Sequence, residues 1–185
     1  MQAVADTTVG GDVTEEASAY KAPAELGDDL FSGIVQYGDA LYQLPAPVSE
    51  FVNNGWTIQP ENSDEKLAAS DTGWVTLMKD NQIYKASVKN YGKSQTTINN
   101  CFVVTIESSE NVKIALTIQK GISVGISEED LLRALEGIDY DCEESELYHA
   151  YEFQVGDNTL SDYEINTKEG KVYKMRLTYQ PKTLD

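Results

Sequence analysis

Residues 36–56 read QYGDALYQLPAPVSEFVNNGW, and residues 119–137 read QKGISVGISEEDLLRALEG. Both stretches run from a Gln-x-Gly triplet through a short apolar stripe to a glycine. The apolar residues of each stripe are spaced as on one face of a helix: Val48, Phe51 and Val52 in the first, and Leu131, Leu132 and Leu135 in the second. Each stretch is therefore predicted to contain a short helix that ends at a glycine.

The match between the two stretches continues along the chain. The separation between matched residues falls from 83, between Gln36 and Gln119, to 73, between Thr105 and Thr178. Two diverged copies with a few small deletions would produce such a steady decrease. The chain is therefore predicted to hold two tandem copies of one structural unit.

Alternating apolar residues predict strands on both sides of each helix. In the first copy the predicted strands are 31–37, 40–44, 56–59, 74–78, 83–90 and 100–108. In the second copy they are 112–119, 147–155, 159–166 and 171–180. The predicted fold class is α+β, with two tandem copies of a strand-helix-antiparallel strand meander unit, each sheet packing one face on its helix. The first repeat spans residues 31–110 and the second residues 111–185.

Local signals predict where the two helices begin and end. Ser127 is followed by three acidic residues, a pattern that resembles a capping box. Its hydroxyl is expected to accept a hydrogen bond from a free N–H of the first helical turn. Gly55 and Gly137 are expected just past the helix ends, with positive φ angles.

Residues 1–30 are rich in Ala, Thr, Gly, Glu and Asp, and few of them are large and apolar. Such a segment buries too little apolar area to offset its ordering entropy, so it is predicted to be a disordered acidic tether. Residues 1–6 lack the charged start and the apolar stretch of a secretory signal. A tether before a β-rich body is typical of a processed surface lipoprotein whose lipid-bearing cysteine lay upstream. A disordered N-terminus of a cytosolic protein is the alternative.

The formal net charge of −17 restricts the partners of the chain. Because the acidic residues are spread over its whole length, a phosphate backbone would be repelled, and nucleic acid is not an expected partner. An anionic membrane surface is unfavourable for the same reason. No apolar run has the length of a membrane span. The acidity favours solubility and a basic partner.

A resemblance to known families rests on two motifs. The segment from Leu44-Pro45 to Asn54-Gly55-Trp56, followed by Asn99-Asn100-Cys101, resembles a pattern of uncharacterised surface lipoproteins of Gram-positive bacteria. This resemblance implies a surface location and no particular reaction. Residues 121–131 are similar to the start of the helix in secreted repeats of the β-lactamase inhibitor protein type and in small envelope lipoproteins.

Cys101 and Cys142 do not occupy matching places in the two copies. A cysteine pair acquired after duplication could join the copies as a disulfide, if its Cα atoms lie within about 7 Å. Two unpaired thiols are the alternative. The chain has no Cys-x-x-Cys spacing, which argues against zinc binding and redox catalysis.

His149 is the only histidine of the chain, and it lies in a predicted strand. A nucleophile of the Ser–His or Cys–His type would have to use it. No nucleophile motif accompanies it, so an ordinary strand histidine is the favoured interpretation.

Acidic residues are densest between positions 139 and 146: Asp139, Asp141, Glu143, Glu144 and Glu146. Carboxylates can hold calcium, but the turn glycine and the ligand spacing of a calcium loop are missing. The segment is therefore predicted to be a solvated loop, and neither a metal nor a cofactor is predicted. Paired carboxylates could also hydrolyse a glycosidic bond. With 31 acidic residues, however, some close pair is inevitable.

Aromatic residues are the strongest candidates for binding. Trp56 and Trp74 lie on either side of an irregular polar segment, and Tyr42, Tyr84 and Tyr91 belong to the same copy. Aromatic faces beside Asn and Asp side chains can stack on sugar rings or anchor a protein partner. These five residues form the predicted binding set. Burial of both tryptophans in the core is the alternative.

The leading functional hypothesis is a non-enzymatic binding protein, secreted or anchored at the cell surface, whose partner is a protein or a glycan. Contact with a membrane is expected only through an N-terminal lipid anchor. One alternative is a dedicated glycan-binding module that uses exposed Trp and Tyr side chains. Another is a hydrolase that uses carboxylates or His149 in a cleft between the copies.

Overall fold

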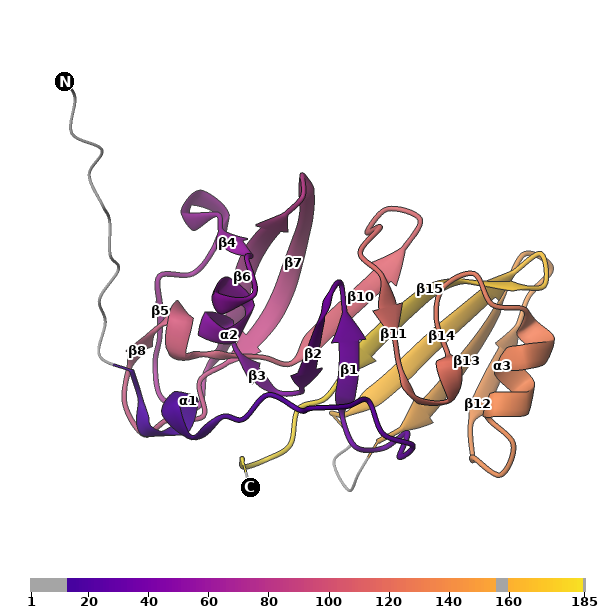
Figure 1. The fold of residues 1–185 in the computed structure, drawn as a ribbon, viewed down its shortest axis with the longest axis horizontal. Helices are drawn as coiled ribbons and strands as arrows, with labels where there is room; N and C mark the ends of the chain where they lie inside the picture. The colour runs from indigo at the N-terminus through magenta and orange to yellow at the C-terminus, as the bar shows by residue number, and fades with distance from the viewer. Residues whose placement is uncertain (1–12, 156–159, 185) are drawn as a thin grey trace.

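The computed structural model describes residues 13–155 and 160–184, and it is built mainly from antiparallel β-sheet (Figure 1). Strands make up 40% of it and helices 16%. The prediction of an α+β fold with two strand-helix-meander units is therefore wrong. The physical reason is the shortness of the helices, because even α3 (Glu128–Ala134) has only 7 residues and cannot form a layer of its own.

The first five-stranded sheet has the order β3-β9-β7-β6-β4. Its strands are β3 (Ala46–Pro47), β9 (Phe102–Val103), β7 (Gln82–Lys89), β6 (Thr72–Lys79) and β4 (Thr57–Ile58). Strands β6 and β7 form a hairpin whose turn residues, Asp80 and Asn81, have φ angles of 49° and 60°. Asp and Asn tolerate these left-handed angles, which a tight hairpin turn requires.

The second five-stranded sheet has the order β10-β15-β14-β13-β12. Its strands are β10 (Thr105–Ser109), β15 (Lys171–Thr178), β14 (Asp162–Lys168), β13 (His149–Gln154) and β12 (Asp141–Glu144). Strand β12 lies at the edge of this sheet, where a solvated loop was predicted. Its four residues are exposed, so it lacks the alternation that reveals a half-buried strand.

Two smaller sheets complete the β-structure. A three-stranded sheet joins β11 (Leu116–Thr117), β1 (Ile34–Tyr37) and β2 (Ala40–Gln43), and a two-stranded sheet joins β5 (Lys66–Leu67) and β8 (Thr96–Thr97). Three short 3-10 helices lie in the connections: η1 (Pro60–Asn62), η2 (Ile98–Asn100) and η3 (Gln119–Gly121). Of the predicted strand over residues 112–119, only Leu116 and Thr117 form a strand, β11.

Both predicted helix ends are confirmed. Helix α2 (Val48–Asn53) is followed by Gly55 at φ 87°, and α3 is followed by Gly137 at φ 81°. The Ser127 hydroxyl accepts a hydrogen bond from the Asp130 N–H at 3.1 Å, as expected for the start of α3. Phe51 of α2 and Leu131 of α3 are fully buried.

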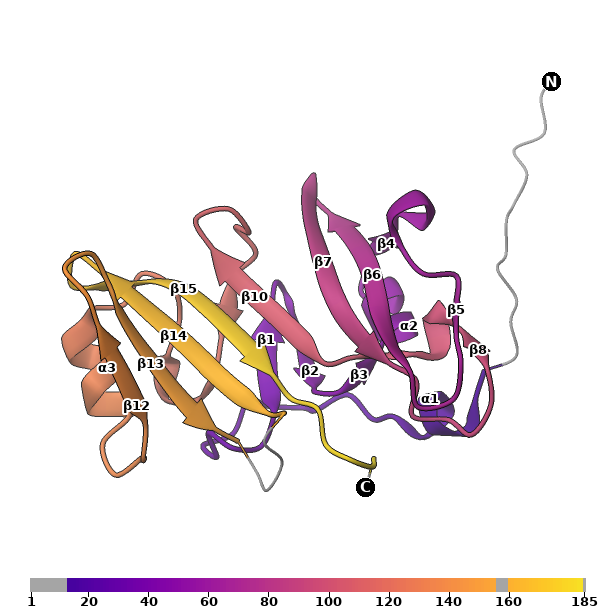
Figure 2. The same ribbon diagram turned by 180° about the vertical axis from the view of Figure 1, so that it is seen from behind.

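The two large sheets lie side by side along the long axis of the molecule. Figures 1 and 2 show α2, α3 and the three-stranded sheet on one side, and the outer faces of both large sheets on the other. Within each sheet, the side chains that alternate toward the helices form the core and those that alternate outward meet solvent. The outer face of each large sheet is therefore free of any covering helix within residues 13–155 and 160–184.

One strand segment passes from the first large sheet to the second. Strand β9 pairs with β7 in the first sheet, and β10, which begins two residues later, pairs with β15 in the second. Between them, the Val104 N–H donates to Ser87 of β7 at 3.0 Å and the Val104 carbonyl accepts from Tyr179 at 2.8 Å. The predicted strand over 100–108 is thus divided at Val104, because its two parts have different partners.

The N-terminal segment lies against the folded body where it is described. The predicted tether covers residues 1–30, of which 1–12 lie outside the described residues. From Val13 on, the segment forms α1 (Glu15–Ala19), and Leu30 is only 3% exposed. The Tyr20 hydroxyl accepts from Gln43 N–H at 3.0 Å, and the Gln119 amide donates to the Leu26 carbonyl at 2.9 Å. Hydrogen bonds thus attach this segment to the folded body, although its apolar residues alone would be too few to do so.

None of the described helices has the length and apolar character needed to cross a membrane.

Candidate functional site

The predicted aromatic binding set is divided by the fold. Trp56, Tyr42 and Tyr84 are buried, and Trp56 stacks on Tyr37 with ring centroids 5.6 Å apart. These three side chains cannot reach a ligand, so their assignment to a binding surface is wrong. The sequence indicates where the strands begin, but it does not show which side of each strand faces the core, so buried and exposed aromatic residues could not be told apart.

Tyr91 is half-buried and has structural contacts. Its ring meets Phe102 edge-on at 5.6 Å, and Lys89 Nζ lies 4.7 Å from its centroid. Its hydroxyl donates to the Pro181 carbonyl at 3.0 Å, and burial raises its pKa above the usual range. Tyr91 therefore fixes the C-terminal residues against the first sheet.

Trp74 is the member of the set that faces solvent. It is 48% exposed and lies on the outer face of β6. Its neighbours on this face are Thr76 of β6 and Ile83 and Lys85 of β7, with Asn62 and Asp64 at the margin. We call these six residues the Trp74 face. They line an open hollow of about 540 Å³, together with Glu61 and Ser63.

Hydrogen bonds hold the backbone under the Trp74 face. The Trp74 N–H donates to Asp64 Oδ2 at 2.8 Å, and the Trp74 carbonyl accepts from the Asp64 N–H at 2.9 Å. The Thr76 hydroxyl donates to the Asn62 carbonyl at 2.7 Å. A Cβ at Gly73 would collide with the Asp64 carboxylate and with Leu67 Cδ2, so glycine leaves room for the hydrogen bond between Asp64 and Trp74. The indole is thus presented from a fixed backbone.

The Trp74 face combines a large apolar surface with one cation. Ile83 is 60% exposed, and Lys85 Nζ lies 5.0 Å from the indole centroid of Trp74, within the range of a cation–π contact. An exposed tryptophan beside an exposed isoleucine can anchor a partner by apolar burial. Sequence reasoning identified Trp74 but missed Ile83 and Lys85, which the outward alternation of β7 could have indicated.

A second group of polar side chains gathers around Glu128, the first residue of α3. Glu128 Oε1 accepts from the Tyr151 hydroxyl at 2.6 Å, from the Thr167 hydroxyl at 2.7 Å and from His149 Nδ1 at 2.7 Å. We call these four residues the Glu128 cluster. Because an ionised carboxylate only accepts, His149 Nδ1 carries a hydrogen and donates it to Glu128. Sequence reasoning did not connect Glu128 with His149, since their contact depends on how α3 meets β13.

The Glu128 cluster joins α3 to β13 and β14. Desolvation acts to raise the pKa of Glu128, but the hydrogen bonds from Tyr151, Thr167 and His149 outweigh it and hold that pKa below its usual range. A histidine oriented by a carboxylate could act as a general base if a nucleophile stood beside it. The thiol of Cys142 lies on the neighbouring strand β12, but desolvation and Glu144 raise its pKa. It is therefore protonated at neutral pH and lacks the activation of a catalytic cysteine, although its exposure leaves it open to thiol reagents.

The two cysteines are both free, so the proposed disulfide does not form. Cys101 is buried next to the first sheet, while Cys142 is exposed on the edge strand of the second. Burial raises the pKa of the Cys101 thiol to about 12. Cys101 thus behaves as a small apolar residue of the core.

The acidic segment predicted between residues 139 and 146 supplies strand β12 and its flanks. Within the described part of the chain, no three acidic, histidine or cysteine side chains are grouped so that they could hold a metal ion. The carboxylates of this segment point into solvent along the sheet edge, where charge discourages pairing with another strand.

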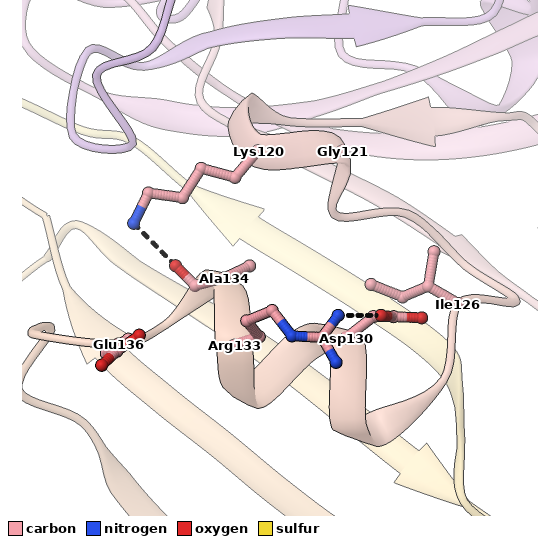
Figure 3. A pocket seen from close by; sticks show the side chains of 7 residues that line it. All are labelled: Lys120, Gly121, Ile126, Asp130, Arg133, Ala134 and Glu136. Carbon is pink, nitrogen blue, oxygen red and sulfur yellow. Dashed lines mark hydrogen bonds and ion pairs between the residues drawn. The ribbon is translucent and has the colours of Figure 1, made fainter.

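A further hollow, of about 640 Å³, lies beside α3 (Figure 3). Three of its four charged side chains, those of Lys120, Asp130 and Arg133, are engaged with the protein itself, and Glu136 lies at its margin. Lys120 Nζ donates to the Ala134 carbonyl at 2.7 Å, at the C-terminal end of the helix, and Arg133 pairs with Asp130 at 2.6 Å. These contacts cap and brace the helix, so the hollow gives no sign of a ligand.

Comparison of the chain with protein-family models, with curated proteins and with solved structures found no match.

Proposed function

We propose that the chain is a non-enzymatic binding protein that holds a protein partner on the Trp74 face. One observation carries the proposal: Trp74 is 48% exposed on a sheet face that no other described element covers. A tryptophan buries more apolar area at an interface than any other residue, and it is enriched among the residues that dominate binding energy.

The surroundings of Trp74 support an interface rather than an accidental exposure. Ile83 extends the apolar area on the adjacent strand. Asp64 fixes the backbone of Trp74 through two hydrogen bonds, so little conformational freedom is lost on binding. Polar residues surround this apolar centre, as in the rim of a protein interface.

The experiment uses a photo-crosslinking amino acid in place of Ile83, in the protein expressed in its native cell. We expect a crosslinked protein that disappears when Trp74→Ala is added. Once the crosslinked partner has been purified, its binding to the chain can be measured directly. Trp74→Ala should raise the Kd of this complex roughly 30-fold, which corresponds to about 2 kcal/mol of binding free energy. Leu147→Ala is the matched control, since Leu147 is an exposed apolar residue of the other large sheet's connections and should leave the Kd unchanged.

A glycan partner is the second candidate, and a specific observation favours it. Trp74 lies beside Asn62 and Asp64, and an aromatic face next to amide and carboxylate groups suits a sugar ring. Binding to a glycan array that is lost in Trp74→Ala, without any protein crosslink at position 83, would replace the protein partner by a glycan. If neither a protein crosslink nor glycan binding is observed, the Trp74 face has no function in binding.

The location of the protein is part of the same proposal. We infer an extracellular protein that is tethered at the cell surface. The support is the resemblance of residues 44–56 and 99–101 to surface lipoproteins. Labelling of intact cells with a reagent that does not enter them should modify the exposed Cys142, and a label confined to lysed cells would contradict this location.

A further inference from the structure

A cleft of about 760 Å³ lies between the N-terminal and C-terminal segments, away from the Trp74 face. One wall is α1 with Tyr20, and the other is formed by Tyr179, Pro181 and Leu184. Leu44, Pro45 and Phe102 also line it. We call it the terminal cleft. Its volume falls within the range of roughly 300–1,000 Å³ typical of small-molecule sites.

Both walls of the terminal cleft are attached to the folded body. The Tyr20 hydroxyl accepts the Gln43 N–H at 3.0 Å, which fixes the N-terminal wall to the outer edge of β2. The Tyr91 hydroxyl donates to the Pro181 carbonyl at 3.0 Å, which fixes the C-terminal wall to the first sheet. The cleft is therefore preformed, as small-molecule sites usually are.

The lining of the cleft combines aromatic rings with carboxylates. Two half-buried tyrosines, Tyr20 and Tyr179, line it, together with Phe102, which is only 2% exposed. Glu15 and Glu16 of α1 lie at its margin, and neither forms an ion pair with any residue of 13–155 or 160–184. One cation, Lys21, lines the cleft as well, so the formal charge of its side chains is negative.

We infer that the terminal cleft binds a small organic cation, an ammonium group that carries an apolar substituent. Aromatic faces attract a cation through their quadrupole, and the two carboxylates add direct charge complementarity. The net charge of −17 raises the local concentration of cations around the whole protein. An anion would meet Glu15 and Glu16, and a neutral apolar molecule would gain nothing from them. This inference is independent of the Trp74 face.

Three probes of nearly equal size test the charge of the ligand: 2-phenylethylammonium, 2-phenylethanol and phenylacetate. Their binding to the whole chain is measured by NMR chemical-shift titration at low ionic strength. We expect the ammonium compound to bind about tenfold more tightly than the alcohol, with the shifts confined to residues that line the cleft. Phenylacetate should not bind. Equal affinity for all three probes would overturn the inference.

Two variants separate the parts of the site. Glu15→Gln combined with Glu16→Gln should reduce the affinity for the ammonium probe about tenfold and leave that for the alcohol unchanged. Glu110→Gln with Glu136→Gln is the matched control, because it removes the same charge from exposed positions outside the cleft. If the control lowers the affinity as much, the effect is one of net charge and the proposed site is wrong.

Tyr179→Ala removes an aromatic wall and should abolish binding of both the ammonium probe and the alcohol. Its fold is checked by the emission of the buried Trp56, which lies in the core of the first sheet. Unchanged binding in a folded Tyr179→Ala protein would show that the probe sits elsewhere and would overturn the inference. Because Trp74→Ala leaves the terminal cleft intact, this variant should bind the ammonium probe and the alcohol with the affinities of the unmodified protein and should not bind phenylacetate. This outcome does not depend on whether the Trp74 face binds a partner.

Discussion

The ring of Tyr37 lies parallel to the indole of Trp56, with an interplanar angle of 4° and centroids 5.6 Å apart. The same tyrosine donates its hydroxyl hydrogen to the Glu107 carbonyl at 2.8 Å. Trp56 belongs to the core beneath the first large sheet, and Glu107 lies on β10 of the second. Tyr37, which belongs to β1 of the three-stranded sheet, thus connects the two five-stranded sheets.

Tyr37→Phe should reduce the free energy of unfolding by about 1–2 kcal/mol, because it keeps the stacked ring and removes a buried hydrogen bond. Urea denaturation followed by tryptophan fluorescence measures this change. Tyr148→Phe is the control, since Tyr148 is 36% exposed and its loss of a hydroxyl should cost nothing measurable. Equal stability of Tyr37→Phe and the unmodified protein would mean that the contact with Glu107 contributes no net stability.

The two cysteines should differ in their reaction with a thiol reagent. Cys142 is exposed and should react in the native protein, whereas Cys101 is buried with a pKa of about 12 and should react only on unfolding. Titration with Ellman's reagent, with and without denaturant, measures both. Cys142→Ser should abolish the native reaction and Cys101→Ser should leave it unchanged. A native protein without any reactive thiol would contradict the free state of Cys142.

Glu128→Gln should destabilise the protein at neutral pH. The hydrogen bonds to Glu128 hold its pKa below the usual value of 4.5, so the ionised carboxylate stabilises the fold. For a lowered acid pKa, this stabilisation is complete above the unfolded pKa and is lost as the pH falls through the folded one. The difference between Glu128→Gln and the unmodified protein should therefore be largest near about pH 7 and shrink below about pH 4.5.

Chemical denaturation at several pH values measures the difference for Glu128→Gln. Glu136→Gln, at an exposed position just after α3, is the matched control and should show no comparable dependence. A Glu128→Gln effect that persists undiminished at low pH would show that the substitution acts through packing and not through the charge.

Glu152→Gln should have the opposite effect and stabilise the protein at neutral pH. Glu152 lies in register between Asp141 of β12 and Glu164 of β14, and like charges directly opposite one another destabilise a sheet. Desolvation, followed by the charges of Asp162, Glu164 and Asp141, raises the pKa of Glu152. A raised acid pKa lowers stability as the pH rises through it.

The gain for Glu152→Gln is expected to be roughly 0.5 kcal/mol near neutral pH. It should vanish at low pH, where Glu152 is protonated, and should shrink in high salt, which screens exposed charges. Thermal denaturation at low and high salt measures it. A loss of stability at every pH would mean that Glu152 makes a favourable contact that outweighs the repulsion.

Local features of the fold could be predicted from the sequence, and the pairing of distant strands could not. Gly55, Gly137 and Ser127 act within one or two turns of chain, and their conformations follow from their own chemistry. Strand β12 was missed because an exposed edge strand has no apolar alternation. The division at Val104 was missed because it depends on β7 and β15, which lie far away in sequence.

The residues of the candidate site were also hard to predict, because their exposure and contacts depend on the assembled fold. Trp56 lies just before β4 and Trp74 near the start of β6, so the two look alike in sequence, and only the assembled fold places one inside and the other outside. The predicted binding set therefore contained the exposed Trp74 together with three buried aromatic residues. The Glu128 cluster required the position of α3 on its sheet, which no periodicity in the sequence encodes.

The passage of one strand segment from β9 to β10 makes the two large sheets thermodynamically inseparable. Neither sheet can release its part of this segment without loosening the part held by the other, because Val104 is bonded to both. Heat or denaturant should therefore melt them in a single cooperative transition, although the sequence contains two similar stretches. The two similar stretches of sequence thus belong to one unit of folding.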